Sequence, residues 1–596
     1  MTTHVVATAG HVDHGKSTLI RALTGMEPDR WEEERRRGLT IDLGFAWVTL
    51  PSGRQVSFVD VPGHGRFMRN ALAGLATVRV VCFVVAADEG WSAQSSDHRD
   101  AIAALGIQHG LIVVTKADRA PDLVAATIER ARKEFAHTGL RDAPALAVSA
   151  VQGAGLDELK QALDKVLAEA PAADRKGRLR LWIDRAFSVS GAGRVVTGTL
   201  SAGTLTVGDR LMIVGHGHEP RAAIIRALET RDQPVEVLPP TARAAVNLRG
   251  VPAGEVGRGH ALVTPGAWFM TSEVDVRRIG GSALDEVPAQ LTVHVGTAAV
   301  PARLRSFDDG HARITLEWPL PLTVGDQLLL RNPASRLVLG GVAVLDPDPP
   351  RLRRRGDGTR RGKVLAAMPP EGDVLTKVAS RGAEKISHLR QIGFLGPRPS
   401  RVRELGDWWV YQPRYEEWQR QLQALVEDDS QRDHLTLGVS QGAVRDALGT
   451  PAATFIDRLV LDAGLEQRDG YIRLPQAGND LGAAEAGVAE LEARLQAEPF
   501  QAPKIGDLAA LGLGIRELAA AERAQRLLRL QGEIVLLPSA PALAMQALAQ
   551  LPQPFTTSQA RQALGTSRRV AIPLLEHLDE SGLTRRVDAD HREVVQ

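Results

Sequence analysis

The sequence predicts a multidomain protein: an α/β domain on a parallel sheet, then two β-barrels, then tandem winged-helix repeats of the α+β type. Three observations lead to this fold class. Apolar strand-like runs alternate with helical patterns over residues 1–170, which is typical of βαβ units. Short alternating runs separated by glycines follow from about 176 to 346, as in all-β barrels. Beyond the basic segment 351–363 the chain is helix-rich and repeats itself.

The composition is that of a chain of several globular domains. The 596 residues contain 44% hydrophobic and 24% charged residues, as is usual for soluble domains. The longest apolar runs, such as Val78–Ala87, are about half as long as a membrane span, and the N-terminus lacks a signal-peptide pattern. One cysteine, Cys82, excludes an internal disulfide framework and a cysteine-based zinc site. We therefore expect a cytoplasmic protein with no membrane partner.

Changes in composition predict the domain boundaries. The expected parts are an α/β domain at 1–174, barrels at 175–268 and 269–348, a basic linker at 349–363, and winged helices at 364–430, 431–477, 478–539 and 540–596. The segment 351–363 carries seven basic residues against Asp357. It is either a solvated linker or a phosphate contact.

An internal repeat marks the last part of the chain. Ala-Leu-Gly-Thr occurs at 447–450 and 563–566, each time followed by a helical pattern, a glycine and a short β-like segment. Residues 522–538 repeat the second half, and residues 386–409 do so more faintly. Two helices followed by a hairpin is the winged-helix arrangement, so we expect four copies. Thr566 is the expected N-cap of the last helix.

The first motif is a phosphate-binding loop. GHVDHGKS, from Gly10 to Ser17, matches GxxxxGK[ST] between an apolar run and a helical pattern, which is the required context. The glycines let backbone N–H groups face phosphate oxygens. Lys16 reaches the β- and γ-phosphates, and the Ser17 hydroxyl binds Mg²⁺. The predicted nucleotide-binding residues here are Gly10, His11, Val12, Asp13, His14, Gly15, Lys16, Ser17 and Thr18.

A second motif, Thr-Lys-Ala-Asp, begins at Thr115 after the strand-like run LIVV. A carboxylate at Asp118 can accept hydrogen bonds from guanine N1–H and the N2 amine together. Adenine lacks that pair of donors, so the motif predicts GTP rather than ATP. The Lys116 stem can lie over the base, and Ser149 with Ala150 fits the remaining base-contact loop.

The sequence DVPGH, beginning at Asp60, predicts the γ-phosphate sensor. Asp60 should hold Mg²⁺ through water, and Thr40 is the expected second hydroxyl ligand beside Ser17. The Gly63 N–H can reach the γ-phosphate. His64 follows it directly, which makes His64 the candidate catalytic residue that orients the attacking water; the alternative is a structural histidine.

GHVDHGKS, RGLTID, DVPGH and TKAD together resemble the translational GTPases, the group of elongation factor Tu and initiation factor 2. The barrel sequence GAGRVVTGTLSAGTLTVGDRL at 191–211 resembles their second domain. ATAGHVDHGKSTLIRALTG, RGLTIDLGFAW, LWIDRAFSVSGAGRVVTGT (181–199) and LGTSRRVAIPLLEHLDESGLTRRV (564–587) are similar to the bacterial selenocysteine-specific elongation factors of the SelB type. The resemblance spans the chain.

This resemblance implies a monomeric factor that delivers selenocysteinyl-tRNA to the ribosome at a recoded UGA codon, while the C-terminal arm holds an mRNA hairpin. It also implies a GTP-driven switch. With GTP bound, Thr40 and Gly63 hold the γ-phosphate; docking on the ribosome positions His64; hydrolysis releases the loops and the tRNA.

The resemblance also implies a pocket for the amino acid. A selenol is more acidic than a thiol, whose reference pKa is about 8.5, so a cationic pocket can distinguish selenocysteine from neutral serine. The family's pocket positions match Phe45, Asp184, Arg185 and Arg243; the alternative is an ordinary surface Asp–Arg pair. Two departures are Phe45, where some relatives have Tyr, and Gly65, where an acidic residue usually follows the histidine.

The repeat itself points to the RNA-binding copy. After Ala-Leu-Gly-Thr the earlier copy continues with Pro-Ala-Ala, whereas the last copy has Ser567, Arg568 and Arg569, and two more arginines, Arg585 and Arg586, at its expected wing. These five residues are the predicted RNA contacts. The alternative is that the arginines are solvated or pair with the acidic residues Asp579 and Glu580.

Two other functions remain open from the residues. Another tRNA-carrying translational GTPase would explain the first 350 residues but not the repeats. A GTP-regulated DNA-binding protein would use the winged helices on duplex DNA, although the barrels favour translation.

Overall fold

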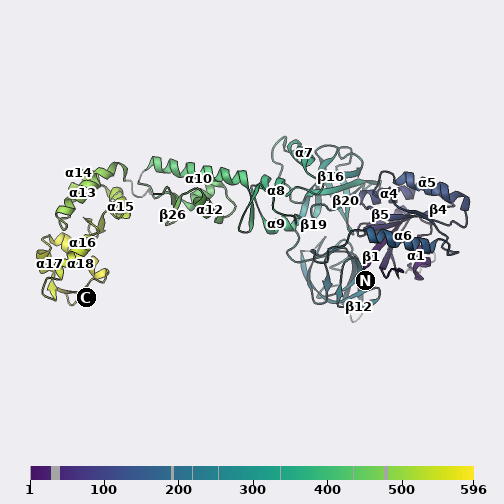
Figure 1. Ribbon diagram of the computed structural model, residues 1–596, viewed down its shortest axis with the longest axis horizontal. Coiled ribbons are helices and arrows are strands. Elements are labelled where there is room, and N and C mark those ends of the chain that lie inside the picture. The colour runs from purple at the N-terminus through teal and green to yellow at the C-terminus, as the bar shows by residue number, and fades with distance from the viewer. Residues whose placement is uncertain are drawn as a thin grey trace. The chain divides into compact units, whose positions relative to one another are not determined.

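The computed structural model (Figure 1) describes residues 2–28, 40–189, 193–217, 219–252, 254–335, 337–433, 435–475 and 481–595. The chain divides into two compact units, Met1–Trp409 and Val410–Gln596. Within the described ranges, every helix is too short or too polar to cross a bilayer. The predicted fold class is confirmed: an α/β domain, β-barrels and winged helices follow one another.

The first domain is a six-stranded sheet in the order β2-β3-β1-β4-β5-β6. All of its pairings are parallel except the one between β2 and β3. β4 is buried along its whole length, as expected for a strand with helices on both faces. The elements are β1 (Thr3–Ala9), α1 (Lys16–Thr24), β2 (Gly44–Thr49), β3 (Gln55–Asp60), α3 (Met68–Leu75), β4 (Val80–Ala86), α4 (Ala93–Ala104), β5 (His109–Thr115), α5 (Val124–Phe135), β6 (Ala145–Ala147) and α6 (Leu156–Glu169).

The second domain is a barrel in the strand order β10-β15-β7-β8-β14-β11-β12, closed by pairing of β10 with β11. Alternate residues of β14 are buried, which is the period-2 pattern of a barrel wall. Its strands are β7 (Arg180–Val189), β8 (Gly193–Leu200), β10 (Arg210–Val214), β11 (Arg221–Thr230), β12 (Gln233–Val235), β14 (Ala242–Arg249) and β15 (Ala261–Val263), with β9 (Leu205–Thr206) and β13 (Val237–Leu238) as a separate pair.

The third domain is a closed barrel in the order β16-β19-β18-β17-β20-β21. It packs closely on the first domain, because a Cβ on Gly341 of β21 would lie 2.1 Å from the Ala104 carbonyl oxygen at the end of α4. The strands are β16 (Met270–Gly281), β17 (Gln290–Val295), β18 (Ala298–Ser306), β19 (His311–Pro321), β20 (Gln327–Arg331) and β21 (Val338–Asp346).

The described residues of the C-terminal part form four successive groups of helices followed by a short hairpin, in keeping with the four expected copies. Each has a leading helix before the two helices and hairpin that the sequence predicted, since α7, α10, α13 and α16 precede the four copies. The elements of the first two copies are α7 (Asp357–Ala367), α8 (Val374–Arg381), β22 (Ala383–Lys385), α9 (Ile386–Gln391), β23 (Val402–Leu405), β24 (Trp408–Tyr411), α10 (Gln412–Arg432), β25 (Val439–Ser440), α11 (Gln441–Leu448), α12 (Thr454–Asp462), β26 (Glu466–Arg468) and β27 (Tyr471–Arg473).

The third and fourth copies share one hydrophobic core that runs from Leu481 to Leu578. Thr566 does not cap the last helix as expected. Its hydroxyl donates to the Phe500 carbonyl of the third copy, and α18 begins at Arg568. The elements are α13 (Glu485–Ala497), α14 (Ile505–Ala510), α15 (Ile515–Arg523), β28 (Leu528–Leu530), β29 (Ile534–Leu536), α16 (Ala540–Leu548), β30 (Phe555–Thr556), α17 (Thr557–Ala563), α18 (Arg568–Glu580), β31 (Thr584–Arg586) and β32 (His591–Val594).

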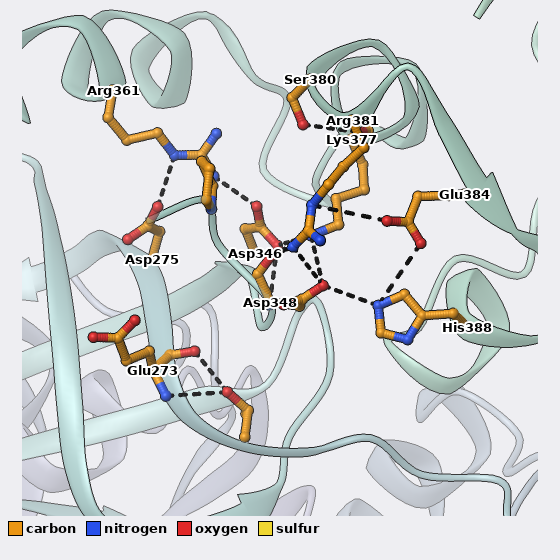
Figure 2. A network of polar contacts seen from close by, with 12 residues as sticks. Glu273, Asp275, Asp346, Asp348, Arg361, Lys377, Ser380, Arg381, Glu384 and His388 are labelled. Carbon is orange, nitrogen blue, oxygen red and sulfur yellow. Dashed lines mark hydrogen bonds and ion pairs between the residues drawn. The ribbon is translucent and has the colours of Figure 1, made fainter. Parts of the chain in front are cut away.

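The basic segment 351–363 is only partly a linker. From Asp357 it forms α7, and Arg361 is 6% exposed, with hydrogen bonds of 2.7 Å to both Asp275 and Asp346 of the third-domain barrel. Figure 2 shows these contacts beside Lys377, which donates to Asp346 at 3.0 Å. A buried charge needs such partners. This part of the segment is therefore a packed helix, which corrects its assignment as a linker.

Candidate functional site

Two glycines shape the loop between β1 and α1. Gly10 has φ +127°, and a Cβ there would lie 2.2 Å from the Val84 carbonyl oxygen. Gly15 has φ +78° and precedes the first residue of α1. Asp13 and Lys116 also have positive φ. Such backbone strain in non-glycine residues is concentrated at functional sites, here in the two loops with predicted nucleotide contacts.

These loops surround a cavity of about 550 Å³. It brings together most of the predicted nucleotide-binding residues, from segments far apart in the chain: Val12, Asp13, Gly15, Lys16, Ser17, Thr18, Thr40, Gly63, Thr115, Lys116, Asp118 and Ala150. The cavity is also lined by Arg21, Glu27, Arg119 and Val151, which the sequence reading missed. Arg21 lies one helical turn beyond Ser17 on α1, so helical spacing was the signal that pointed to it.

Six predicted residues do not line this cavity: Gly10, His11, His14, Asp60, His64 and Ser149. Gly10 packs against the Val84 carbonyl of β4, where a side chain would collide. The His11 and His14 rings face Gln94 and the Val84 carbonyl instead. Ser149 acts through Asp118, because its hydrogen bond to that carboxylate lowers the pKa of Asp118.

The three predicted Mg²⁺ ligands lie together at the start of α1. The Ser17 hydroxyl donates to the Asp60 carboxylate at 2.6 Å and lies 3.1 Å from the Thr40 hydroxyl. Asp60 is fully buried and also accepts from the Thr8 hydroxyl at 2.6 Å. Two hydroxyls and a carboxylate are the hard oxygen donors that Mg²⁺ prefers, so these residues fit the ion.

Gly63 packs directly on the phosphate-binding loop. A Cβ there would lie 2.4 Å from the Val12 nitrogen and 2.5 Å from the Lys16 Nζ. The next residue, His64, is exposed and turned away from the cavity; its Nδ1 accepts from the Arg66 backbone N–H at 3.1 Å. The backbone of the sensor loop is thus in place, whereas the candidate catalytic side chain is not.

Two histidines under this site are fully buried. Burial lowers the pKa of His14 to about 4 and that of His98 to about 3. Both side chains are therefore neutral near pH 7.

A second cavity, of about 320 Å³, lies between β2 and β3 of the first domain and the second-domain barrel. Three residues of the expected amino-acid pocket, Phe45, Arg185 and Arg243, line it. The guanidinium carbons of Arg243 and Arg185 lie 4.0 and 4.9 Å from the Phe45 ring centroid, within cation–π range. Asp184 is buried behind the cavity wall, where it forms an ion pair with Arg243. Glu229 also lines the cavity and was missed.

The predicted RNA contacts have different environments. All four arginines are exposed, and they differ in their partners. Arg569 donates to the carbonyls of Ala502 and Pro503, at 2.8 and 3.0 Å, and Arg585 pairs with Glu593. The expected alternative partner Asp579 is instead bonded to Arg592 at 2.8 Å, and Ser567 stands at the helix N-cap without a side-chain cap bond.

Comparisons with known proteins agree with this geometry. The model of the elongation factor Tu GTP binding domain matches residues 1–169. The model of the β-barrel domain of selenocysteine-specific elongation factors matches 281–351, and the winged-helix model of elongation factor SelB matches 546–592.

Whole-chain relatives extend the match. A selenocysteine-specific elongation factor of Escherichia coli is 30% identical over 98% of both chains, and one of Desulfomicrobium baculatum is 34% identical over 65% of this chain and 63% of its own. A crystal structure of a bacterial selenocysteine-specific elongation factor covers all of both chains with a TM-score of 0.77 at 26% identity. Together with the GTP-binding motifs and the winged helices, these matches show that the chain belongs to the selenocysteine-specific elongation factors and is a translational GTPase.

Proposed function

We propose that this GTPase carries selenocysteinyl-tRNA to the ribosome at recoded UGA codons, acting as a monomer in the cytoplasm, while its C-terminal arm binds an mRNA hairpin. The observation that carries the proposal is the second cavity, where two guanidinium groups lie over the Phe45 ring. A selenolate is an anion at neutral pH, whereas the serine that precedes it on the tRNA is neutral. A cationic pocket distinguishes the two by charge.

The acidic neighbours hold these arginines in place. Asp184 bonds Arg243, and Asp42 lies 3.4 Å from the Arg185 Nε. A guanidinium has five N–H donors, so Arg243, held by one carboxylate and by Thr199, keeps donors for a bound anion. Phe45 provides an apolar face that excludes water and strengthens the charge interaction. The pocket thus supports recognition of a side chain that is small, polarizable and negative.

The pocket is linked to the nucleotide site by the residues after Thr40. Arg258 of the second domain donates to Asp42 and to Asn70 of α3, each at 2.6 Å, while Asn70 donates to the Ile41 carbonyl. Thr40 lines the nucleotide cavity two residues earlier. A change of this segment on hydrolysis would therefore reach the amino-acid pocket directly, which supports release of the tRNA.

For hydrolysis, the chain's residues have distinct roles. Lys16 and the Gly63 N–H hold the γ-phosphate, and Asp118 with Lys116 and Ser149 holds the guanine. Bound Mg²⁺, held by Ser17, Thr40 and Asp60, would neutralise phosphate charge. His64 must rotate from its exposed position to orient the attacking water. We assign that rotation to docking on the ribosome, which keeps hydrolysis slow until the codon is reached.

The test is binding of GTP-loaded full-length protein to one tRNA charged with serine, cysteine or selenocysteine. We expect tightest binding to the selenocysteinyl form. Equal affinity for all three would overturn the selenocysteine assignment while leaving a general tRNA carrier. The arm is tested in parallel with a hairpin RNA and a DNA duplex of the same length, and tighter binding to the duplex would favour a DNA-binding function.

A further inference from the structure

Three side chains with metal-ligand chemistry meet behind the phosphate-binding loop. The ligand atoms of His11, His14 and Glu89 all lie within 4.8 Å of one another. The His14 Nε2 is 3.9 Å from a Glu89 carboxylate oxygen. None of the three lines the nucleotide cavity. The cluster is therefore distinct from the predicted Mg²⁺ site, to which Ser17 belongs.

The hydrogen bonds of both histidines involve Nδ1, which leaves the Nε2 of each ring available to a metal. The His14 Nδ1 faces the Val84 carbonyl oxygen at 3.2 Å, and the His11 Nδ1 faces the Gln94 side-chain oxygen at 2.6 Å. An oxygen of this kind only accepts, so each Nδ1 carries the proton and each Nε2 carries a lone pair. Metal-binding histidines are usually oriented in this way by an acceptor on the other nitrogen.

The His14 Nε2 is buried and has no hydrogen-bond partner, although a buried polar atom without a partner destabilises the folded protein. The side chain of His14 is fully buried, and that of Glu89 is 40% exposed. The lone pair thus lies near a carboxylate at the surface, whose other oxygen bonds Lys116. A metal ion bound between the two groups would give the His14 Nε2 a partner.

We propose that His11, His14 and Glu89 form a binding site for a divalent transition metal of the Zn²⁺ class. Two imidazoles and a carboxylate form an established ligand set for such ions. Zinc at about 2.0–2.1 Å from each ligand requires ligand atoms about 3.3 Å apart. The ligand atoms lie within 4.8 Å of one another, so the side chains must draw closer together to bind the ion, and water would complete the coordination.

A second cluster with the same ligand types is unsuitable. Asp348, Glu384 and His388 also lie together, as Figure 2 shows, but Lys377 and Arg381 approach the Asp348 carboxylate at 3.3 and 2.8 Å. These two cations already neutralise the site where an ion would sit. At Glu89, Lys116 approaches one carboxylate oxygen, whereas the other faces His14.

Metal binding at this site is coupled to nucleotide binding. Two of the ligands belong to the phosphate-binding loop, and the third bonds Lys116, whose side chain lines the nucleotide cavity. An ion that draws Glu89 away frees Lys116 from this partner and adds positive charge behind the phosphates. Both effects favour nucleotide, and linkage requires that nucleotide tighten metal binding by the same factor.

The experiment titrates full-length protein without a histidine tag with Zn²⁺, in competition with a chromophoric chelator and in excess Mg²⁺. We expect one ion per chain in the wild type and in a His388→Gln control. Glu89→Gln and His14→Gln should each weaken binding by at least about tenfold, the lower end of the effect of altering a metal site.

Glu89→Gln decides the outcome, because Glu89 is partly exposed, while His14→Gln disturbs a fully buried position. Unchanged Zn²⁺ affinity in Glu89→Gln, or a loss seen only in His388→Gln, would overturn the proposal. GDP affinity is measured with and without Zn²⁺ in the same samples. Intact GDP binding without any Zn²⁺ binding would reject the metal site and leave the nucleotide site unaffected.

Discussion

The nucleotide site and the C-terminal arm differ in how sequence becomes a binding surface. At the nucleotide site, short contiguous motifs supply most residues, and the loops at the ends of β1, β3 and β5 converge on one cavity. In the arm, four arginines were predicted to bind RNA, but Arg569 and Arg585 are used in contacts within the chain. Motifs that shape the backbone are therefore reliable, whereas the role of an isolated arginine depends on its neighbours.

The largest effect is expected from His64→Ala, which tests a motif residue whose side chain lies outside the cavity. Ribosome-stimulated GTP hydrolysis should fall by at least ~10²-fold, the usual scale for a positioned proton-handling group. GTP affinity should be nearly unchanged, because His64 does not line the cavity. Single-turnover hydrolysis on ribosomes measures the effect, and a wild-type rate would show that the neighbouring motif residues suffice.

Asp118→Asn tests base choice within the nucleotide cavity, which Asp118 lines. The carboxylate is expected to accept two hydrogen bonds from guanine. GTP affinity should fall by on the order of 10²-fold when these bonds to a charged acceptor are lost, while xanthosine triphosphate gains, since its C2 oxygen suits an amide donor. Competition binding with both nucleotides provides the measurement; unchanged preference for GTP would refute the assignment.

The amino-acid pocket is intermediate between the nucleotide site and the C-terminal arm, because its arginines bind within the chain and are also proposed to bind a ligand. Arg185→Ala should reduce discrimination between selenocysteinyl- and seryl-tRNA by about tenfold or more, as expected for one charge-assisted contact. Arg210→Ala, an exposed arginine on β10 outside the cavity, is the control. If affinity for both tRNAs falls equally, Arg185 only supports the domain contact.

The smallest effect separates two adjacent arginines of α18. Arg568→Ala should weaken hairpin RNA binding and reduce the salt slope by about 0.7–0.9, the value for one lost phosphate contact. Arg569→Ala should leave the slope unchanged and lower the stability of the arm, because Arg569 joins α18 to the third repeat. Salt titrations and thermal melts distinguish the two variants. The reverse pattern would place the RNA contact at Arg569.

The sequence by itself determined the order of the domains and most of the nucleotide cavity. The reason is local: glycines at positive φ, a strand before and a helix after a loop, and a carboxylate at a strand end each constrain the backbone within a few residues. Gly63 is an exception, because its lack of a side chain serves a contact with Val12, which is far away in sequence.

The tertiary structure alone decided which charged side chains have partners within the chain and which remain available to a ligand. Arg361 is buried against acids 15 and 86 residues away in sequence, and Thr566 bonds a carbonyl 66 residues earlier. The leading helix of each repeat and the shared core of the last two copies likewise follow from packing between repeats. Such long-range partners leave no periodic signal in the sequence, because a charge or a hydroxyl is satisfied by whichever group the fold brings within about 3 Å of it.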